Sequence, residues 1–131
     1  MKLYLDTDLF LAAVKQKDHL KDAALRFFKK CKKEELYTSE ATVLEVWHYL
    51  RRNNMEEKAL EAIEHMEGLV AEILPLEHIH VKQAILLAAN YRLSPSDAIH
   101  AIYAENMDAI VATDHKFDII PNLKKIDFSK S

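Results

Sequence analysis

Two aspartates stand directly after short apolar segments that lie far apart in the chain. Asp6 follows residues 2–5, KLYL, and Asp114 follows residues 110–113, IVAT. Carboxylates without Cys or His partners suit hard cations such as Mg²⁺ or Mn²⁺. Each aspartate also has a plain structural interpretation, because Asp6 can begin a helix and Asp114 can belong to a turn. The pattern indicates a metal site only if the fold brings the two acids together.

A third carboxylate, Asp97, lies in a segment typical of the start of a helix. In LSPSDAIHAIY (residues 93–103), Ser94 can act as the N-cap, and Pro95 suits the first helical position. Asp97 follows three residues after the serine, as in a capping box. It can therefore be a capping residue, a metal ligand, or both. His100 follows one turn later on the same helical face, where it either packs or contacts the site.

Apolar segments that alternate with helical patterns predict how these acids are positioned. Segments of strand type cover residues 2–5, 36–39, 70–76, 108–113 and 124–128. Apolar side chains recur at helical spacing from about residue 7, over 19–33, 40–53, 55–69 and 77–93, and from 94 to 106. The N-cap of the first helix is expected at Thr7 or Asp8, and Gly68 is expected to end the fourth helix.

This alternation predicts a single α/β domain over residues 1–131, in which a central, mainly parallel sheet is flanked by helices. The strands are apolar along their length, as expected for strands that are buried on both faces. In such sheets, ligands bind beyond the carboxyl ends of the strands. Asp6 and Asp114 would share one crevice if their strands are neighbours.

Composition excludes several other classes of protein. Gly68 is the only glycine, so the sequence has no glycine-rich phosphate loop and no dinucleotide-binding fingerprint. The single cysteine, Cys31, excludes an internal disulfide and fits a reducing cytosol, so we expect a cytoplasmic protein. No apolar run reaches the roughly 18 residues of a membrane helix. The net charge of −3 gives no overall attraction to nucleic acid.

Other candidate residues have more ordinary interpretations. His78 and His80 have neither a cysteine partner nor an HExxH pattern, so zinc is not expected. Two basic clusters are expected to be solvated helix faces rather than phosphate contacts. These clusters are Lys29, Lys30, Lys32 and Lys33, and Arg51, Arg52 and Lys58.

Four segments, taken in order, resemble the four signatures of the PIN-domain family. They are LDTDLFLAAV (5–14), EATVLEVWHYL (40–50), SPSDAIHAIYA (94–104) and IVATDHKFD (110–118). The resemblance spans essentially the whole chain, whose size is similar to that of small stand-alone members such as VapC-type toxins of VapBC toxin–antitoxin pairs. It implies a three-layer α/β/α PIN-like fold and a Mg²⁺- or Mn²⁺-dependent endoribonuclease. Carried over residue by residue, the site would consist of Asp6, Glu45, Asp97 and Asp114.

Within this resemblance, Asp6 and Asp97 would bind the metal directly, and Glu45 and Asp114 would complete the cluster directly or through water. Phosphodiester hydrolysis needs an activated water and a stabilised leaving oxygen, both of which a divalent ion can supply. Glu45 has no support apart from the resemblance. A helical wheel places it opposite the apolar face of its helix, where a solvated glutamate is the default.

Three positions depart from the family pattern or lie beside it. Asp8 stands where the family often has Asn or Ser, so it is either an extra charge at the rim of the site or only a cap. Thr113 directly precedes Asp114, whereas many relatives carry the hydroxyl residue one position earlier. Asp118 is a further acid nearby, and we expect it to be peripheral.

The resemblance also implies an RNA substrate, an antitoxin partner that covers or enters the acidic crevice, and a homodimer. Two other classes stay open: a PIN scaffold that binds RNA or protein without cutting, and a phosphatase-like hydrolase, which LDTD resembles superficially. Metal-dependent cleavage of RNA, compared with a small phosphate ester, distinguishes these classes. We expect part of the apolar helix faces that carry Phe27, Phe28, Trp47 and Leu50 to form the dimer interface.

Overall fold

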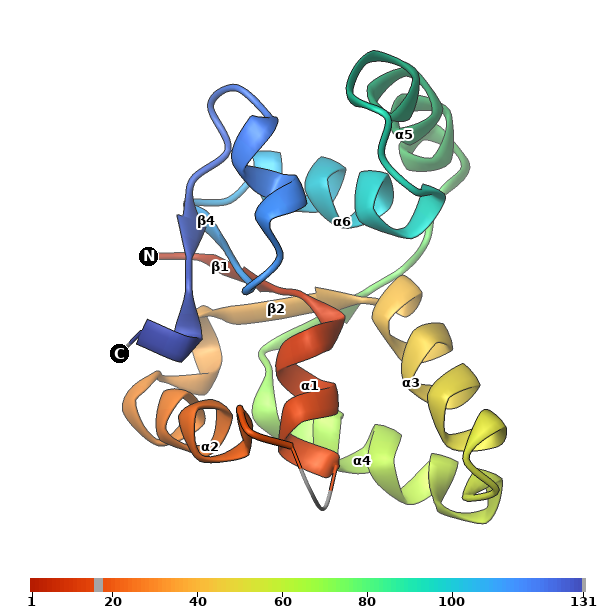
Figure 1. The fold of residues 1–131 in the computed structure, drawn as a ribbon, viewed down its shortest axis with the longest axis vertical. Coiled ribbons are helices and arrows are strands. Elements are labelled where there is room, and N and C mark those ends of the chain that lie inside the picture. The colour runs from red at the N-terminus through yellow and green to blue at the C-terminus, as the bar shows by residue number, and fades with distance from the viewer. Residues whose placement is uncertain (16–17, 131) are drawn as a thin grey trace.

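A five-stranded sheet runs through the centre of the molecule (Figure 1). The computed structural model describes residues 1–15 and 18–130. Within these residues the strand order is β3-β2-β1-β4-β5, and every neighbouring pair is parallel. The predicted central, mainly parallel sheet is therefore confirmed. The strands are β1 (Leu3–Leu5), β2 (Leu36–Ser39), β3 (Glu72–Leu74), β4 (Ala109–Val111) and β5 (Lys125–Ile126).

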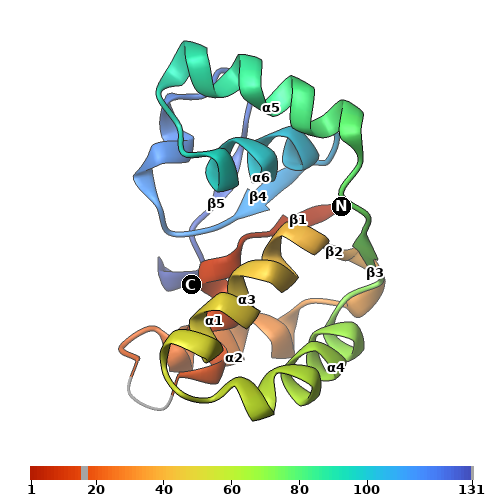
Figure 2. The same ribbon diagram turned by 90° about the vertical axis from the view of Figure 1, so that its right-hand side faces the viewer.

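Helices cover both faces of this sheet and complete a three-layer α/β/α fold. Figure 2 shows α1 to α4 on one side of the sheet and α5 with α6 on the other. None of the helices in the described ranges is both long enough and apolar enough to cross a membrane. The helices are α1 (Thr7–Val14), α2 (Lys21–Lys30), α3 (Glu40–Arg52), α4 (Ala59–Leu69), α5 (His78–Tyr91) and α6 (Pro95–Glu105).

The central strand β1 shows why its residues are apolar throughout. Leu3 and Leu5 pack into the core formed with α1 to α4, whereas Tyr4, between them, packs into the core formed with α5 and α6. All three side chains are buried. The side-chain period of two sends alternate residues to opposite faces, and both faces are covered.

Two helix ends differ by one residue from the capping positions expected. The N-cap of α1 is Asp6 rather than Thr7 or Asp8, because Asp6 still has extended backbone and donates its N–H to the carbonyl of Val111 at 3.1 Å. Helix α4 ends one residue after Gly68, and Gly68 has no positive φ. The chain leaves the helix at Val70, whose extended backbone buries its side chain in the core.

Most of the apolar helix faces expected to contribute to a dimer interface are buried within the chain. Phe27 and Leu50 are buried in the core of the domain, and Phe28 packs against that core. Only Trp47 of these four is exposed, at 46% of its surface. The apolar spacing in α2 and α3 therefore mainly serves packing within one chain.

Candidate active site

The two aspartates that follow strands emerge at the same edge of the sheet. Strands β1 and β4 are neighbours, and Leu5 lies opposite Val111 in their register. The chain then continues directly into Asp6 on one strand and through Ala112 and Thr113 to Asp114 on the other. The condition set by the sequence, that these strands be neighbours, is met.

Asp6 and Glu45 meet at the imidazole of His100. Nε2 of His100 lies 2.5 Å from Oε1 of Glu45 and 3.5 Å from Oδ1 of Asp6. The hydroxyl of Thr7 also donates to Oε1 of Glu45, at 3.0 Å. The three charged side chains come from the end of β1, from α3 and from α6, so the tertiary fold assembles this group.

The structure corrects the default expectation for Glu45 and extends the one for His100. Glu45 lies opposite the apolar face of α3, yet α3 also contacts α6, and the Glu45 side chain reaches His100 of α6 and is only 34% exposed. His100 is 1% exposed and has polar partners at both ring nitrogens. It is therefore more than a packing residue. Its position one turn after Asp97 was the sequence signal for this contact.

Asp97 and Asp114 meet at a different cation, the ammonium group of Lys116. Nζ of Lys116 lies 3.4 Å from Oδ2 of Asp97 and 4.0 Å from Oδ2 of Asp114. Asp97 also takes part in the predicted cap, because its backbone N–H donates to Oγ of Ser94 at 3.2 Å. The cap uses the backbone of Asp97 and leaves its carboxylate available. The role of Lys116 was missed, because nothing in the local pattern distinguishes this lysine from others.

Asp8 joins the two strand ends. Its Oδ2 accepts hydrogen bonds from the backbone N–H of Thr113 at 3.0 Å and from the hydroxyl of Thr113 at 2.6 Å. Oδ1 of Asp8 is buried and has no hydrogen-bond partner among the residues that the structure describes. Asp8 is therefore neither the cap of α1 nor a loose charge at the rim, and the Thr113 hydroxyl is already engaged.

Asp118 is paired outside this group of acids. Its carboxylate lies 2.9 Å from Nζ of Lys125 and 3.0 Å from Nδ1 of His115. Hydrogen bonds from Lys125 and then from His115 hold the pKa of Asp118 below its usual value. These contacts agree with a peripheral position.

Burial and crowding of acids shift the protonation equilibria at the sheet edge. Burial raises the pKa of Asp6 to about 7, against the attraction of His100, and the charges of Asp8 and Glu45 raise it further. Burial alone would lower the pKa of His100, but Tyr4 and the acids Glu45 and Asp6 outweigh it and hold that pKa well above its usual value. The site therefore favours an added positive charge.

Comparison with known proteins identifies the family. The family model of the PIN domain matches residues 3–123, a range that contains all four acids. The chain belongs to the PIN domain family. Comparison with curated protein sequences finds no match.

Solved structures with this PIN fold include toxins and toxin–antitoxin complexes. DNA-bound VapBC from Salmonella typhimurium has a TM-score of 0.76 and 21% identity, and the match covers 98% of each chain. VapC20 of Mycobacterium tuberculosis, a toxin that cleaves the sarcin-ricin loop, has a TM-score of 0.73 and 18% identity over 83% of this chain and 87% of that one. At such identities the likeness supports the fold alone.

The donor atoms of this PIN domain fit a hard divalent cation by their chemistry. Carboxylate oxygens surround the sheet edge, and one of them, Oδ1 of Asp8, is buried without a partner among the described residues. Within residues 1–15 and 18–130, however, no three Asp, Glu, His or Cys side chains are grouped closely enough to hold one metal ion. The acids instead form two pairs: His100 bridges Asp6 and Glu45, and Lys116 bridges Asp97 and Asp114.

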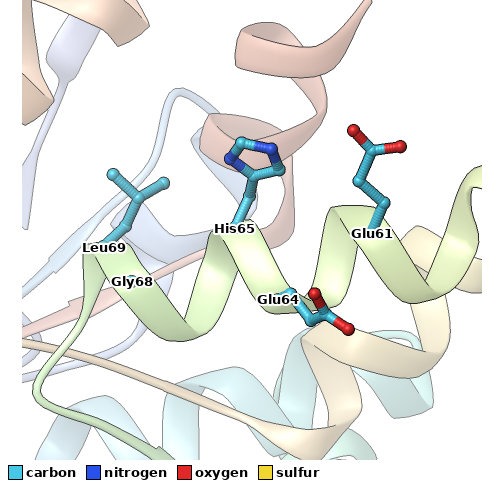
Figure 3. A pocket seen from close by; sticks show the side chains of 5 residues that line it. All are labelled: Glu61, Glu64, His65, Gly68 and Leu69. Carbon is cyan, nitrogen blue, oxygen red and sulfur yellow. The ribbon is translucent and has the colours of Figure 1, made fainter.

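Pockets elsewhere on the PIN domain involve other residues. One of about 470 Å³ lies along α4 and is lined by Glu61, Glu64, His65, Gly68 and Leu69. Figure 3 shows Glu61 and His65 on one side of α4 and Glu64 on another. None of the four predicted site acids lines this pocket, so its carboxylates are separate from the sheet edge.

Proposed function

We propose that this PIN domain is a metal-dependent endoribonuclease and the toxin of a toxin–antitoxin pair. One observation carries the proposal: four acids from distant parts of the chain gather in two pairs at the carboxyl ends of neighbouring strands and at the helices beside them. Asp6 pairs with Glu45 through His100, and Asp97 pairs with Asp114 through Lys116. Ligands of open α/β sheets bind at this edge.

In this proposal Asp6 and Asp97 hold Mg²⁺ or Mn²⁺ directly, and Glu45 and Asp114 complete the cluster directly or through water. When bound, a divalent ion lowers the pKa of its water and neutralises charge that develops on the phosphate. Thr7 supports Glu45 by donating a hydrogen bond to Oε1. Burial of Asp6 excludes bulk water from one side of the acids, which strengthens their attraction for a cation.

The proposed substrate is RNA, and the proposed partners are an antitoxin and a second copy of this chain. Support for RNA and for the antitoxin comes from the structural neighbours, since one is a toxin that cleaves the sarcin-ricin loop and others are toxin–antitoxin complexes. The antitoxin would cover the acidic crevice.

Sedimentation at micromolar concentration tests the homodimer, and a strict monomer contradicts it. We also propose that the protein acts in the cytoplasm.

The nuclease function is tested by measuring the cleavage of RNA in Mn²⁺ and in EDTA, with a small phosphate ester assayed as an alternative substrate. Asp97→Asn should abolish product, because this carboxylate would hold the ion. Asp22→Asn is a matched control, since Asp22 is an exposed acid in the first turn of another helix, α2. Equal RNA cleavage by wild type and Asp97→Asn would contradict the assignment, and turnover of the ester alone would favour a phosphatase.

A second candidate function is RNA or protein binding without cleavage. The observation that favours it is that the described residues contain no group of three donors close enough for one ion. The same assay separates the two functions. A binding module would retain RNA in EDTA and release no product in Mn²⁺.

A further inference from the structure

A row of buried polar side chains leads from the end of β2 to Glu45. Oγ of Ser39 and the hydroxyl of Tyr4 lie 2.7 Å apart, and the same hydroxyl lies 2.7 Å from Nδ1 of His100. The other ring nitrogen, Nε2, contacts Glu45 at 2.5 Å. Ser39 and Tyr4 are fully buried, and His100 is 1% exposed. Neither Tyr4 nor Ser39 belongs to the proposed metal site.

The neighbours of His100 determine how its ring is used. Nε2 lies 2.5 Å from Oε1 of Glu45, and a carboxylate oxygen accepts hydrogen bonds, so we assign a hydrogen to Nε2. The Tyr4 hydroxyl can donate to Nδ1 or accept from it, and Ser39 can take the complementary role. Since both nitrogens have buried partners, turning the ring would break two hydrogen bonds at once.

Ring contacts also restrain Tyr4. Its ring stacks on that of Tyr103, with centroids 5.8 Å apart and planes 6° from parallel, and it contacts the ring of His100 at 5.6 Å. Tyr103 itself donates its hydroxyl to the carbonyl of Pro75, away from the acids. The aromatic packing holds Tyr4 in place, while its hydroxyl makes the polar connection to His100.

We infer that Tyr4 and His100 are positioning residues that hold the Glu45 carboxylate beside Asp6 in readiness for a cation. Glutamate is long and flexible, and Glu45 is partly exposed, so its place depends on these contacts. Both the His100 and the Thr7 hydrogen bonds use Oε1. No hydrogen bond in the described part of the chain uses Oε2, so this oxygen is free to bind a metal ion. The effect on catalysis rests on the proposed nuclease function, whereas the effect on metal affinity rests only on the metal site proposed with it.

Tyr4→Phe tests the inference with the smallest change, because it removes one hydroxyl and keeps the ring. It leaves Nδ1 of His100 and Oγ of Ser39 buried without that partner, so the imidazole is freed to turn. Loss of a residue that orients a metal ligand typically lowers metal affinity or activity by 10-fold or more. We therefore expect the Mn²⁺ affinity of Tyr4→Phe, measured by calorimetry, to fall about tenfold. With saturating Mn²⁺, kcat on RNA should fall while KM is unchanged.

Tyr103→Phe is the matched control, since it removes the hydroxyl hydrogen bond of the tyrosine stacked on Tyr4. It should leave Mn²⁺ affinity unchanged even if it lowers the melting temperature. In a Glu45→Gln background, Tyr4→Phe should have no further effect on Mn²⁺ affinity. His100→Gln, which keeps an N–H donor, should retain more Mn²⁺ affinity than His100→Leu.

The outcomes separate this inference from the proposed function. If folded Tyr4→Phe binds Mn²⁺ as wild type does, the positioning role is wrong. If wild type binds Mn²⁺ and Tyr4→Phe weakens it, but neither cuts RNA, the nuclease proposal fails and the positioning role stands. A wild-type chain that does not bind Mn²⁺ at all overturns both.

Discussion

Asp8 and Thr113 join the two strand ends that carry the acids. One carboxylate oxygen, Oδ2 of Asp8, accepts both the backbone N–H and the hydroxyl of Thr113, at 3.0 and 2.6 Å. Asp8 lies two residues after Asp6, and Thr113 directly precedes Asp114. The contact therefore ties together, beyond the β1–β4 pairing, the two segments that carry Asp6 and Asp114.

Thr113→Val should destabilise the domain while keeping the shape of the side chain. It removes a hydrogen bond to a charged group, which typically contributes about 1.5 to 3 kcal/mol to the free energy of unfolding. Urea unfolding of Thr113→Val, of Asp8→Ala and of the double variant measures the coupling energy between the two side chains. If Thr113→Val costs the same with and without the Asp8 carboxylate, the contact does not stabilise the fold.

Ser94→Ala and Asp97→Asn should separate stability from activity within one turn of α6. The Ser94 hydroxyl accepts the Asp97 N–H, so its loss should lower the free energy of unfolding by about 0.5 to 2 kcal/mol and leave RNA cleavage largely intact. Asp97→Asn keeps that backbone hydrogen bond and should abolish cleavage. If Ser94→Ala is fully folded under the assay conditions and still loses RNA cleavage, stability and activity are not separated in this way.

Lys116→Met should increase the affinity for Mn²⁺. The Lys116 ammonium lies between Asp97 and Asp114 and competes with any other cation for them. We expect an increase of only a few-fold, because exposed ion pairs are weak. Lys124→Met, which removes the same charge from an exposed lysine that directly precedes β5, is the control in calorimetry. An equal gain in both variants would point to net charge rather than to this contact.

The sequence was informative where local pattern and backbone connection decide the structure. Buried strands and helical periodicity predicted the parallel sheet and placed Asp6 and Asp114 at strand ends, and the Ser94 pattern predicted the cap of α6. That the strands of Asp6 and Asp114 are neighbours was only a condition in the sequence, and the structure supplies it. The sequence was less informative where separate elements meet. A helical wheel for α3 contains no information about α6, so it could not predict the contact of Glu45 with His100. The pairing of Lys116 with two acids likewise depends on tertiary structure.

The measurement that tests the central claim most directly is unfolding of wild type and Asp6→Asn, each in EDTA and in Mn²⁺. In wild type, Mn²⁺ at about 100 times its dissociation constant should add about 2.7 kcal/mol to the free energy of unfolding. Asp6→Asn should be equally stable or more stable in EDTA, because it removes a buried negative charge near Asp8 and Glu45, and it should lose most of the gain from Mn²⁺. Asp22→Asn should behave as wild type does. If Asp6→Asn is much less stable in EDTA and still gains fully from Mn²⁺, Asp6 is a structural residue of the α1 N-terminus and the proposed metal site is wrong.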